Sequence, residues 1–186
     1  MGLRIITGSL KKKKLLSVRG NKTRPTADRL RETIFNILYD NVSGAVVLDL
    51  FAGTGALGIE ALSRGADYVI FVEKSKAATN IIKQNIKLCK LENKTTVMTM
   101  DALKDLRCIK SITPFFDMVF MDPPYNKGLI MPTLMNLRKS FLLKKNACIV
   151  VESSDKEVIP QSCNGYNIYD QRKYGRTVVF YLTYIE

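Results

Sequence analysis

An acid followed by two prolines and an aromatic residue is the part of this chain best suited to chemistry. The tetrapeptide Asp122-Pro123-Pro124-Tyr125 comes directly after an apolar run at 118–121. Proline cannot donate to a sheet ladder, so two in succession end a strand abruptly. Open α/β sheets bind ligands at the carboxyl ends of their strands. A carboxylate, free carbonyls and an aromatic face at that place suit a flat base with an amino group, although the same turn can simply end a strand.

Three glycines upstream predict a cofactor site. They follow the strand expected at 46–51, open a helix and have the Gly-x-Gly-x-x-Gly spacing that lets a backbone approach a ligand closely: Gly53, Gly55 and Gly58. A nicotinamide or flavin nucleotide would be the usual ligand of such a loop. Asp49, however, lies four residues before the first glycine. A carboxylate there would repel a pyrophosphate and attract an ammonium or sulfonium group.

Two further acids end the next strands expected along the chain. Glu73 ends the strand at 68–73, where an acid can accept both hydroxyls of a ribose. Asp101 follows the strand at 95–100, where its carboxylate could accept an adenine amino group or could only cap the next helix. Parallel strands present their carboxyl ends at one edge of a sheet. We therefore expect these acids and the 122–125 turn to lie together.

The composition excludes several kinds of site. The chain has 186 residues and no histidine, which removes the Ser-His and Cys-His nucleophile pairs. Its four cysteines show no Cys-x-x-Cys spacing, so neither a zinc site nor a disulfide framework is expected. No apolar stretch approaches the ~20 residues needed to cross a bilayer, and the first residues lack the apolar stretch of a secretory signal. We expect a cytoplasmic protein whose chemistry depends on carboxylates, backbone groups or a reactive cofactor.

The net charge of +12 is concentrated near the N-terminus, where residues 1–31 hold ten lysines and arginines and a single acid. Such an arm attracts phosphate, or it is a solvated tail that only aids solubility. Apolar pairs on both sides of the lysine run favour an ordered hairpin. Arg31 lies at the margin of an apolar helical stripe and either reaches water or points into a cleft. The phosphate-binding candidates are Lys11, Lys12, Lys13, Lys14, Arg24, Arg29 and Arg31.

Apolar strands alternate with helices from residue 46 onwards, which predicts an α/β, Rossmann-like sheet with helices on both faces. A first helix, capped by Thr26, precedes them. Two segments near the C-terminus, 166–172 and 177–185, are expected to form an antiparallel hairpin at one edge of a seven-stranded, mostly parallel sheet. We place a basic N-terminal hairpin at 1–24 and the α/β domain at 25–186. The expected strands are 46–51, 68–73, 95–100, 116–121 and 147–152, and the helices between them are 56–64, 75–91, 103–109 and 132–142.

These motifs resemble those of the class I S-adenosylmethionine-dependent methyltransferases. Asp49-Leu-Phe-Ala-Gly-Thr-Gly is similar to their first motif and Asp122-Pro-Pro-Tyr to their fourth. Arg4-Ile-Ile-Thr-Gly, Thr23-Arg-Pro-Thr-Ala-Asp-Arg-Leu-Arg-Glu-Thr-Ile-Phe-Asn and Gly58-Ile-Glu-Ala-Leu-Ser-Arg-Gly-Ala closely resemble the RsmD family, and the likeness covers almost the whole chain. It implies methylation of a guanine exocyclic N2 in bacterial 16S ribosomal RNA, with S-adenosylmethionine as cofactor. One departure is the run of four lysines, where the family mixes glycine, lysine and arginine; lysine binds phosphate as a point charge rather than a planar fork.

The resemblance also implies roles for individual residues. The catalytic set would be Asp122 and the Pro123 carbonyl, which accept the amine hydrogens, and Tyr125, which stacks on the flipped-out base. The basic residues would bind RNA. The cofactor would be bound by Asp49, Phe51, Gly53, Gly55, Glu73, Lys74, Asp101, Ala102 and Asp122.

The expected partner is 16S rRNA, within a small ribosomal subunit or an assembly intermediate, bound by a monomer without a metal or a membrane. The Asp-Pro-Pro-Tyr turn does not itself distinguish guanine from adenine. An adenine-N6 methyltransferase acting on DNA or RNA therefore remains an alternative. A non-catalytic RNA-binding or ribosome-assembly protein that keeps the fold is another.

Overall fold

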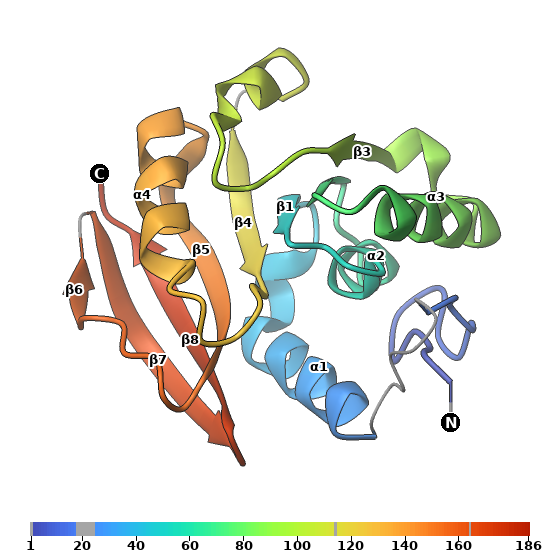
Figure 1. Cartoon of the computed structure of the whole chain (residues 1–186). Helices are drawn as coiled ribbons and strands as arrows, with labels where there is room; N and C mark the ends of the chain where they lie inside the picture. Colours follow the sequence, from blue (N-terminus) through green and yellow to red (C-terminus); the bar gives the residue numbers. More distant parts are fainter. Residues whose placement is uncertain (1, 18–24, 114, 164) are drawn as a thin grey trace.

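The computed structural model describes residues 2–17, 25–113, 115–163 and 165–186 (Figure 1). Arg24 and the predicted boundary between residues 24 and 25 lie outside these ranges. Four α-helices occur in the described part, together with the short 3-10 turns Tyr39–Val42, Glu92–Lys94 and Leu106–Ser111: α1 (Pro25–Leu38), α2 (Ala56–Ser63), α3 (Lys76–Cys89) and α4 (Ile130–Ser140). None of the described helices is long and apolar enough to cross a membrane.

One sheet joins all the described strands, in the order β3-β2-β1-β4-β5-β8-β7-β6. The pairs from β3 to β5 are parallel, and β8 runs antiparallel to both β5 and β7. The order therefore reverses between β1 and β4, which is where open α/β sheets form a ligand crevice. The strands are β1 (Val46–Leu50), β2 (Tyr68–Glu73), β3 (Thr95–Thr99), β4 (Phe116–Met121), β5 (Leu143–Ser154), β6 (Ser162–Cys163), β7 (Tyr166–Tyr174) and β8 (Thr177–Tyr184).

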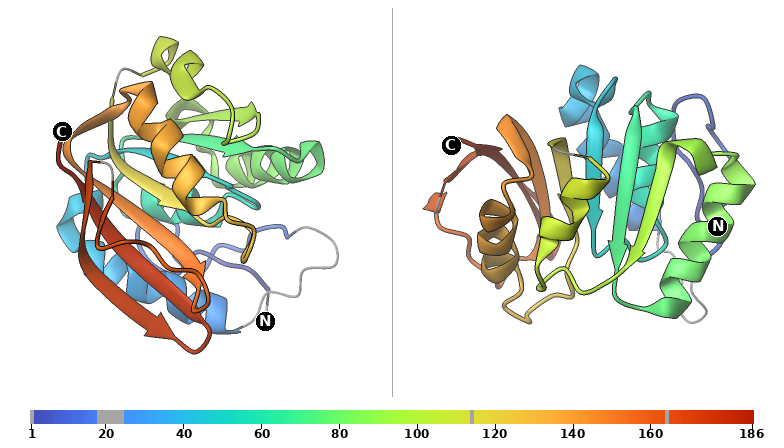
Figure 2. Two further views of the ribbon diagram at one scale, coloured as in Figure 1. Left: turned by 60° about the vertical axis from the view of Figure 1, so that its left-hand side comes forward. Right: turned by 90° about the horizontal axis from the view of Figure 1, so that it is seen from above.

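Helices cover both faces of the sheet, because its central strands are apolar on both sides (Figure 2). One buried cluster joins α4 and the turn at Leu106–Ser111 to one face. The other cluster joins α1, α2, α3 and the N-terminal segment to the opposite face, where the rings of Phe35 and Phe120 are 5.4 Å apart. The predicted mostly parallel α/β sheet with its antiparallel C-terminal hairpin is confirmed.

Several predicted details were wrong. The two-residue strand β6 adds an eighth strand to the seven expected. Helix α1 begins at Pro25, before the predicted cap Thr26. Proline suits the first helical position because its fixed φ is already helical and its missing N–H would be unpaired there. Strand β5 begins at Leu143 rather than 147. Leu143 pairs with Phe116 of β4, the register then shifts before Cys148, and the exposed polar side chains at 144–146 hide the strand pattern.

The N-terminal segment, residues 2–17, forms the predicted hairpin in its described part. The N–H of Ile5 donates to the Lys13 carbonyl at 2.9 Å, and that of Leu15 donates to the Leu3 carbonyl at 2.9 Å. Arg4 and Lys14 form an antiparallel bridge between the two arms. Leu3, Ile5 and Leu15 are buried in the same cluster as α1, α2 and α3. The lysine run is thus displayed from an ordered hairpin.

Two buried polar side chains attach this segment to the helices. Glu60 of α2 is fully buried, and its carboxylate accepts the N–H groups of Ile6 at 2.8 Å and Thr7 at 2.9 Å. Asn85 of α3, also fully buried, accepts the N–H of Leu16 at 2.7 Å and donates to the Leu16 carbonyl at 3.1 Å. Unpaired backbone groups are unfavourable in a buried place, so these contacts fix the segment.

Candidate active site

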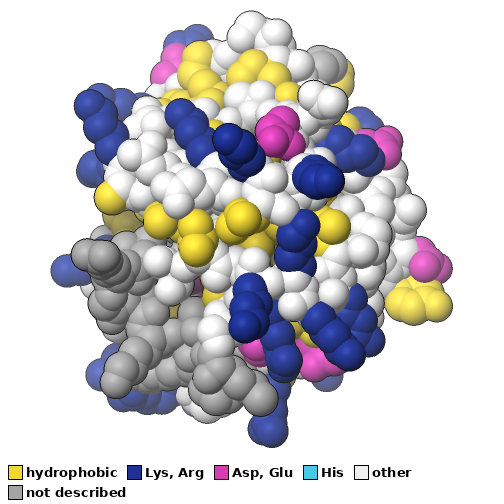
Figure 3. Space-filling model, turned by 90° about the vertical axis from the view of Figure 1, so that its right-hand side faces the viewer, with side chains coloured by type: hydrophobic (Ala, Val, Ile, Leu, Met, Phe, Trp, Pro, Cys, Tyr) yellow, Lys and Arg dark blue, Asp and Glu magenta, His cyan; other side chains and the backbone are white. Residues whose placement is uncertain are grey.

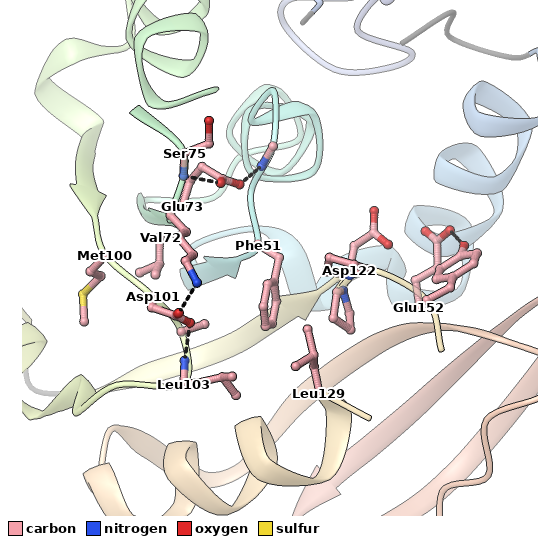
Figure 4. A pocket seen from close by; sticks show the side chains of 16 residues that line it. Phe51, Val72, Glu73, Ser75, Met100, Asp101, Leu103, Asp122, Leu129 and Glu152 are labelled. Atoms are coloured by element: carbon pink, nitrogen blue, oxygen red, sulfur yellow. Dashed lines mark hydrogen bonds and ion pairs between the residues drawn. The ribbon is translucent and has the colours of Figure 1, made fainter. Parts of the chain in front are cut away.

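Two cavities open at the carboxyl ends of the parallel strands and meet at the 122–125 turn. The first has a volume of about 740 Å³ and extends over the ends of β2 and β3 (Figure 4). The second has a volume of about 840 Å³ and extends towards α1 and the β7–β8 turn. Both lie at the reversal of strand order between β1 and β4. The residues that line both cavities are Phe51, Gly53, Asp122, Tyr125 and Glu152.

The glycine loop after β1 has left-handed backbone at three positions. The φ angle is 59° at Phe51, 56° at Gly53 and 76° at Gly55. Glycine adopts this conformation without a Cβ clash, whereas a bulky residue such as phenylalanine is strained there, as often happens at functional sites. With this backbone conformation, the ring of Phe51 lies in the wall of the first cavity (Figure 4). At Gly58 a Cβ would lie 2.3 Å from the Phe71 ring, so glycine lets α2 pack against β2.

Asp49 supports the glycine loop from within β1. Its side chain is 2 % exposed, and Oδ2 accepts the N–H of Gly58 at 2.9 Å. Burial raises the pKa of this carboxyl to about 7, and the charge of Glu73 contributes in the same direction. Asp49 borders the second cavity and not the first. A cation near this carboxyl would favour its ionised form.

Glu73 connects the end of β2 to the same loop. Its Oε2 accepts the N–H of Gly53 at 2.9 Å, and its Oε1 accepts the N–H of Ser75 at 2.7 Å. The carboxylate is therefore oriented along the wall of the first cavity (Figure 4). Each oxygen retains a second acceptor site, which suits the hydroxyls of a ribose.

Asp101 forms the far wall of the first cavity, opposite the loop. Lys74 donates to its Oδ2 at 2.8 Å, and the N–H of Leu103 donates to its Oδ1 at 3.1 Å. The hydrogen bond from Lys74 is the main reason that the pKa of Asp101 is lowered. Asp101 therefore both caps the turn that follows it and faces the cavity, where Ala102 and Lys74 lie beside it.

Asn136 of α4 is a supporting residue that the sequence analysis missed. Its Nδ2 donates to the carbonyl of Ala102 at 2.9 Å and also to the carbonyl of Lys104. The segment that follows β3 is thereby fixed to α4. An asparagine within a helical stretch gives no sequence signal for such a contact.

The 122–125 turn lies between the two cavities. The Asp122 side chain is exposed, and its open surface faces both cavities. Desolvation by the protein around the turn raises the pKa of Asp122 well above its usual range, and the charges of Glu152 and Asp49 raise it further. The hydroxyl of Tyr125 donates to Glu152 and lies 3.2 Å from the hydroxyl oxygen of Thr177. The predicted catalytic residues Asp122, Pro123 and Tyr125 therefore line one cavity together.

Glu152 is the functional candidate that the sequence analysis did not select. It lies near the end of β5, one residue beyond the pair Met121 and Val151, so it is the neighbour of Asp122 across the sheet. Figure 4 shows both side chains in the same part of the cavity. The signal was available, because Glu152 ends the strand expected at 147–152.

The residues predicted to bind RNA differ in how far the structure exposes them. Lys11, Lys12, Lys14 and Arg29 are exposed and Lys13 is half-buried. Arg31 was predicted to bind RNA, but its side chain is only 6 % exposed and its guanidinium donates to the Arg4 carbonyl at 2.6 Å and to Asp28 at 3.1 Å. Its Nε also lies 3.7 Å from Glu60. These contacts hold the N-terminal segment on α1. Arg31 also lines the second cavity, and its predicted role in RNA binding stays a prediction.

Helix α3 adds lysines to the basic surface. The N-terminal segment lies against this helix, where the Leu16 N–H donates to Asn85. Figure 3 shows lysine and arginine side chains spread over this face of the molecule. The sequence analysis missed these lysines because they are spaced as an ordinary solvated helical face. The exposed ones on and after α3 are Lys76, Lys83, Lys87, Lys90 and Lys94.

The fold and the site together define a class I methyltransferase. The chain matches a family model described as "Conserved hypothetical protein 95" over residues 3–183. It is 37 % identical over 158 residues to the ribosomal RNA small subunit methyltransferase D of Haemophilus influenzae, covering 84 % of this chain and 82 % of that protein. The protein of the same name from Escherichia coli strain K12 is 34 % identical over 174 residues, covering 94 % and 86 %. The chain belongs to the RsmD family.

Solved structures agree with this assignment. The candidate methyltransferase yhhF of Escherichia coli superposes with a TM-score of 0.83 at 31 % identity, covering 98 % of this chain and 97 % of the other. The candidate methylase HI0767 of Haemophilus influenzae gives a TM-score of 0.80 at 30 % identity, with 100 % of both chains covered.

Proposed function

We propose that this protein transfers a methyl group from S-adenosylmethionine to the exocyclic N2 of a guanine in small-subunit ribosomal RNA. The observation that carries the proposal is the meeting of two cavities at the Asp122 turn. One cavity suits the methyl donor and the other suits the base. The names of the relatives support ribosomal RNA as the substrate class.

The first cavity has the groups that the donor requires. Glu73 can accept ribose hydroxyls, and Asp101, whose oxygens each keep a second acceptor site, can accept an adenine amine. Val72, Met100 and Leu103 supply apolar walls for the flat adenine ring (Figure 4). A volume of about 740 Å³ lies within the usual range for a cofactor pocket. S-adenosylmethionine would supply an electrophilic methyl group on a positively charged sulfur, which the nearby carboxylates favour.

Asp122 would orient the acceptor amine. An exocyclic amine is a weak nucleophile, because its lone pair is delocalised into the ring. The Asp122 carboxylate and the Pro123 carbonyl can each accept one amine hydrogen, which directs the nitrogen lone pair towards the first cavity. The raised pKa of Asp122 also lets this carboxylate take the proton that the amine loses as the new bond forms. Positioning and electrostatics can supply much of the rate enhancement.

The second cavity and the basic surface would hold the RNA. Tyr125 and Glu152 line the second cavity, as do Lys156 and Arg176, whose charges suit the phosphates on either side of a flipped-out base. The exposed lysines of the N-terminal segment and of α3 would contact phosphates farther away. We expect a cytoplasmic monomer that acts on a small subunit or an assembly intermediate. Within such a particle, one basic face could dock on folded RNA.

The test is methylation with labelled cofactor, offered naked 16S rRNA, small subunits or DNA, followed by mapping of the modified base. We expect label on guanine N2 in the ribosomal RNA. Asp122→Ala should lower turnover by about 10²-fold or more while cofactor binding changes little. The exchange of an exposed acid, Asp105→Ala, is the matched control and should leave turnover unchanged. Label in adenine, or an Asp122→Ala turnover within about threefold of wild type, would contradict the proposal.

A further inference from the structure

We propose that Glu152 accepts the N1–H of the target guanine beside Asp122, and that this contact makes the site select guanine over adenine. The inference rests on the proposed function and adds a specificity-determining residue to it. The Asp-Pro-Pro-Tyr turn contacts only an amine, which both bases possess, so the selection must come from another group.

The sheet places Glu152 next to Asp122. Met121, the last residue of β4, is paired in parallel with Val151 of β5; Asp122 directly follows the first and Glu152 the second. Neighbouring strands are about 4.8 Å apart. Two carboxylates at this spacing can approach two adjacent atoms on one edge of a base. Both acids line both cavities, so a base that reaches Asp122 also meets Glu152.

A phenol fixes the direction of the Glu152 carboxylate. Tyr125 donates its hydroxyl to Oε1, and Thr177 is hydrogen-bonded to the same tyrosine. Among the residues that the structure describes, no hydrogen bond is made to the other oxygen, Oε2. One oxygen is therefore held by the protein and the second is left as an acceptor towards the cavities. Burial raises the pKa of Glu152, and the hydrogen bond from the phenol acts in the opposite direction, so it favours the ionised form in which Oε2 is an acceptor.

The two purines differ at the atom that would face Oε2. Guanine presents N1–H and the N2 amine side by side, so two adjacent carboxylates can accept from both. Adenine presents its amine beside N1, which carries a lone pair and no hydrogen. A carboxylate opposite that nitrogen loses a hydrogen bond and meets a second acceptor in a partly buried site. Sites built to hydrogen-bond a donor reject an analogue that lacks it by large factors, at best about 10⁴–10⁵-fold.

The experiment replaces the mapped target guanine in an RNA substrate with 2-aminopurine. This base keeps the 2-amino group but carries an unprotonated N1. The quantity measured is the ratio of kcat/KM for guanine to that for 2-aminopurine. We expect about 100-fold or more in the wild-type protein. In Glu152→Gln the side-chain amide can donate to the unprotonated N1, so the ratio should fall by at least about tenfold.

Comparing ratios between proteins cancels the different intrinsic reactivity of the two amines. Tyr125→Phe keeps the aromatic ring but releases Glu152, and it should also lower the ratio. Glu92→Gln is the matched control, because Glu92 is an exposed acid in the turn that precedes β3. It should leave the ratio unchanged. A purely structural role for Glu152 would lower both rates equally and would not move the ratio.

The outcomes separate this inference from the function on which it rests. A wild-type protein that methylates guanine in ribosomal RNA and accepts 2-aminopurine within about threefold overturns the role of Glu152 and leaves the function intact. An unchanged ratio in folded Glu152→Gln has the same meaning. Wild-type protein that labels no guanine at all overturns the proposed function, and the inference with it. If Glu152→Gln does not fold, the ratio in Tyr125→Phe supplies the comparison with the wild-type protein.

Discussion

Glu60→Ala tests whether a buried carboxylate holds the N-terminal segment on the fold. Glu60 has no exposed surface and receives three hydrogen bonds, from Ile6 at 2.8 Å, Thr7 at 2.9 Å and Arg64 Nε at 3.0 Å. Arg31 Nε lies 3.7 Å from it. Alanine would leave two backbone N–H groups and the buried guanidinium of Arg31 without this partner.

The expected loss of stability follows from these partners. Hydrogen bonds to a charged group contribute about 1.5–3 kcal/mol each, so the two backbone bonds account for about 3–6 kcal/mol. Breaking a buried ion pair from one side gives a similar estimate of about 3–5 kcal/mol. These estimates describe the same atoms and are not added. We therefore expect a loss of about 4 kcal/mol, a large part of the roughly 5–15 kcal/mol that stabilises a domain.

Urea denaturation gives the global loss, and amide hydrogen exchange locates it. The amides of Ile6 and Thr7 should lose protection first, because the segment can detach before the sheet unfolds. Glu60→Gln keeps one acceptor oxygen and should lose less. Glu32→Ala, on the exposed face of α1, should stay within about 0.5 kcal/mol of wild type. A loss below about 1 kcal/mol in Glu60→Ala, or unchanged protection at the two amides, would refute the reasoning.

Two further predictions concern charge. The pKa of Asp49 is about 7 in the folded protein and about 3.9 in the unfolded chain. The folded state therefore binds more protons than the unfolded chain between these pH values. The free energy of unfolding should fall by up to about 4 kcal/mol as the pH rises from about 4 to 7. Urea titrations should show a flatter profile in Asp49→Asn, and an unchanged profile would contradict the raised pKa. Glutamine at residues 11–14 should flatten the salt dependence of RNA binding, lowering the slope of log K against log salt by up to about 3. An equal decrease after the same exchange at Lys110, Lys139, Lys144 and Lys145 would show that the position of the lysines is irrelevant.

Most of the fold was predictable, because apolar runs of strand length alternate with helices from residue 46. The failures were at element ends. The start of β5 was missed because Lys144, Lys145 and Asn146 are exposed and break the apolar pattern, and because the pairing with β4 is irregular there. The two-residue strand β6 could not be recognised, since it depends on its partner β7 and has no pattern of its own.

The cofactor side of the site was predictable for a different reason. Acids that follow parallel strands must gather at one sheet edge, so their positions in the chain imply their neighbourhood in space. Partners across elements had no such signal. Asn136 contacts the segment after β3 from a different helix, and Arg31 donates to the Arg4 carbonyl rather than to solvent. A basic residue at the margin of a helical apolar stripe can reach water or point inward, and the packing of the N-terminal segment decides which of the two occurs.

Asn85 connects the N-terminal hairpin to the glycine loop. Its side-chain amide donates to the Leu16 carbonyl at 3.1 Å and to the Thr54 carbonyl of the glycine loop at 3.0 Å. One buried group thus binds both the hairpin that carries the lysine run and the loop that would hold the cofactor. A tail that only attracted RNA would not need a fixed position relative to that loop. The hairpin is instead built into the core, so a phosphate bound by its lysines has a defined place relative to the loop and to the Asp122 turn beside it. Such placement serves orientation of the base more than simple capture of the RNA.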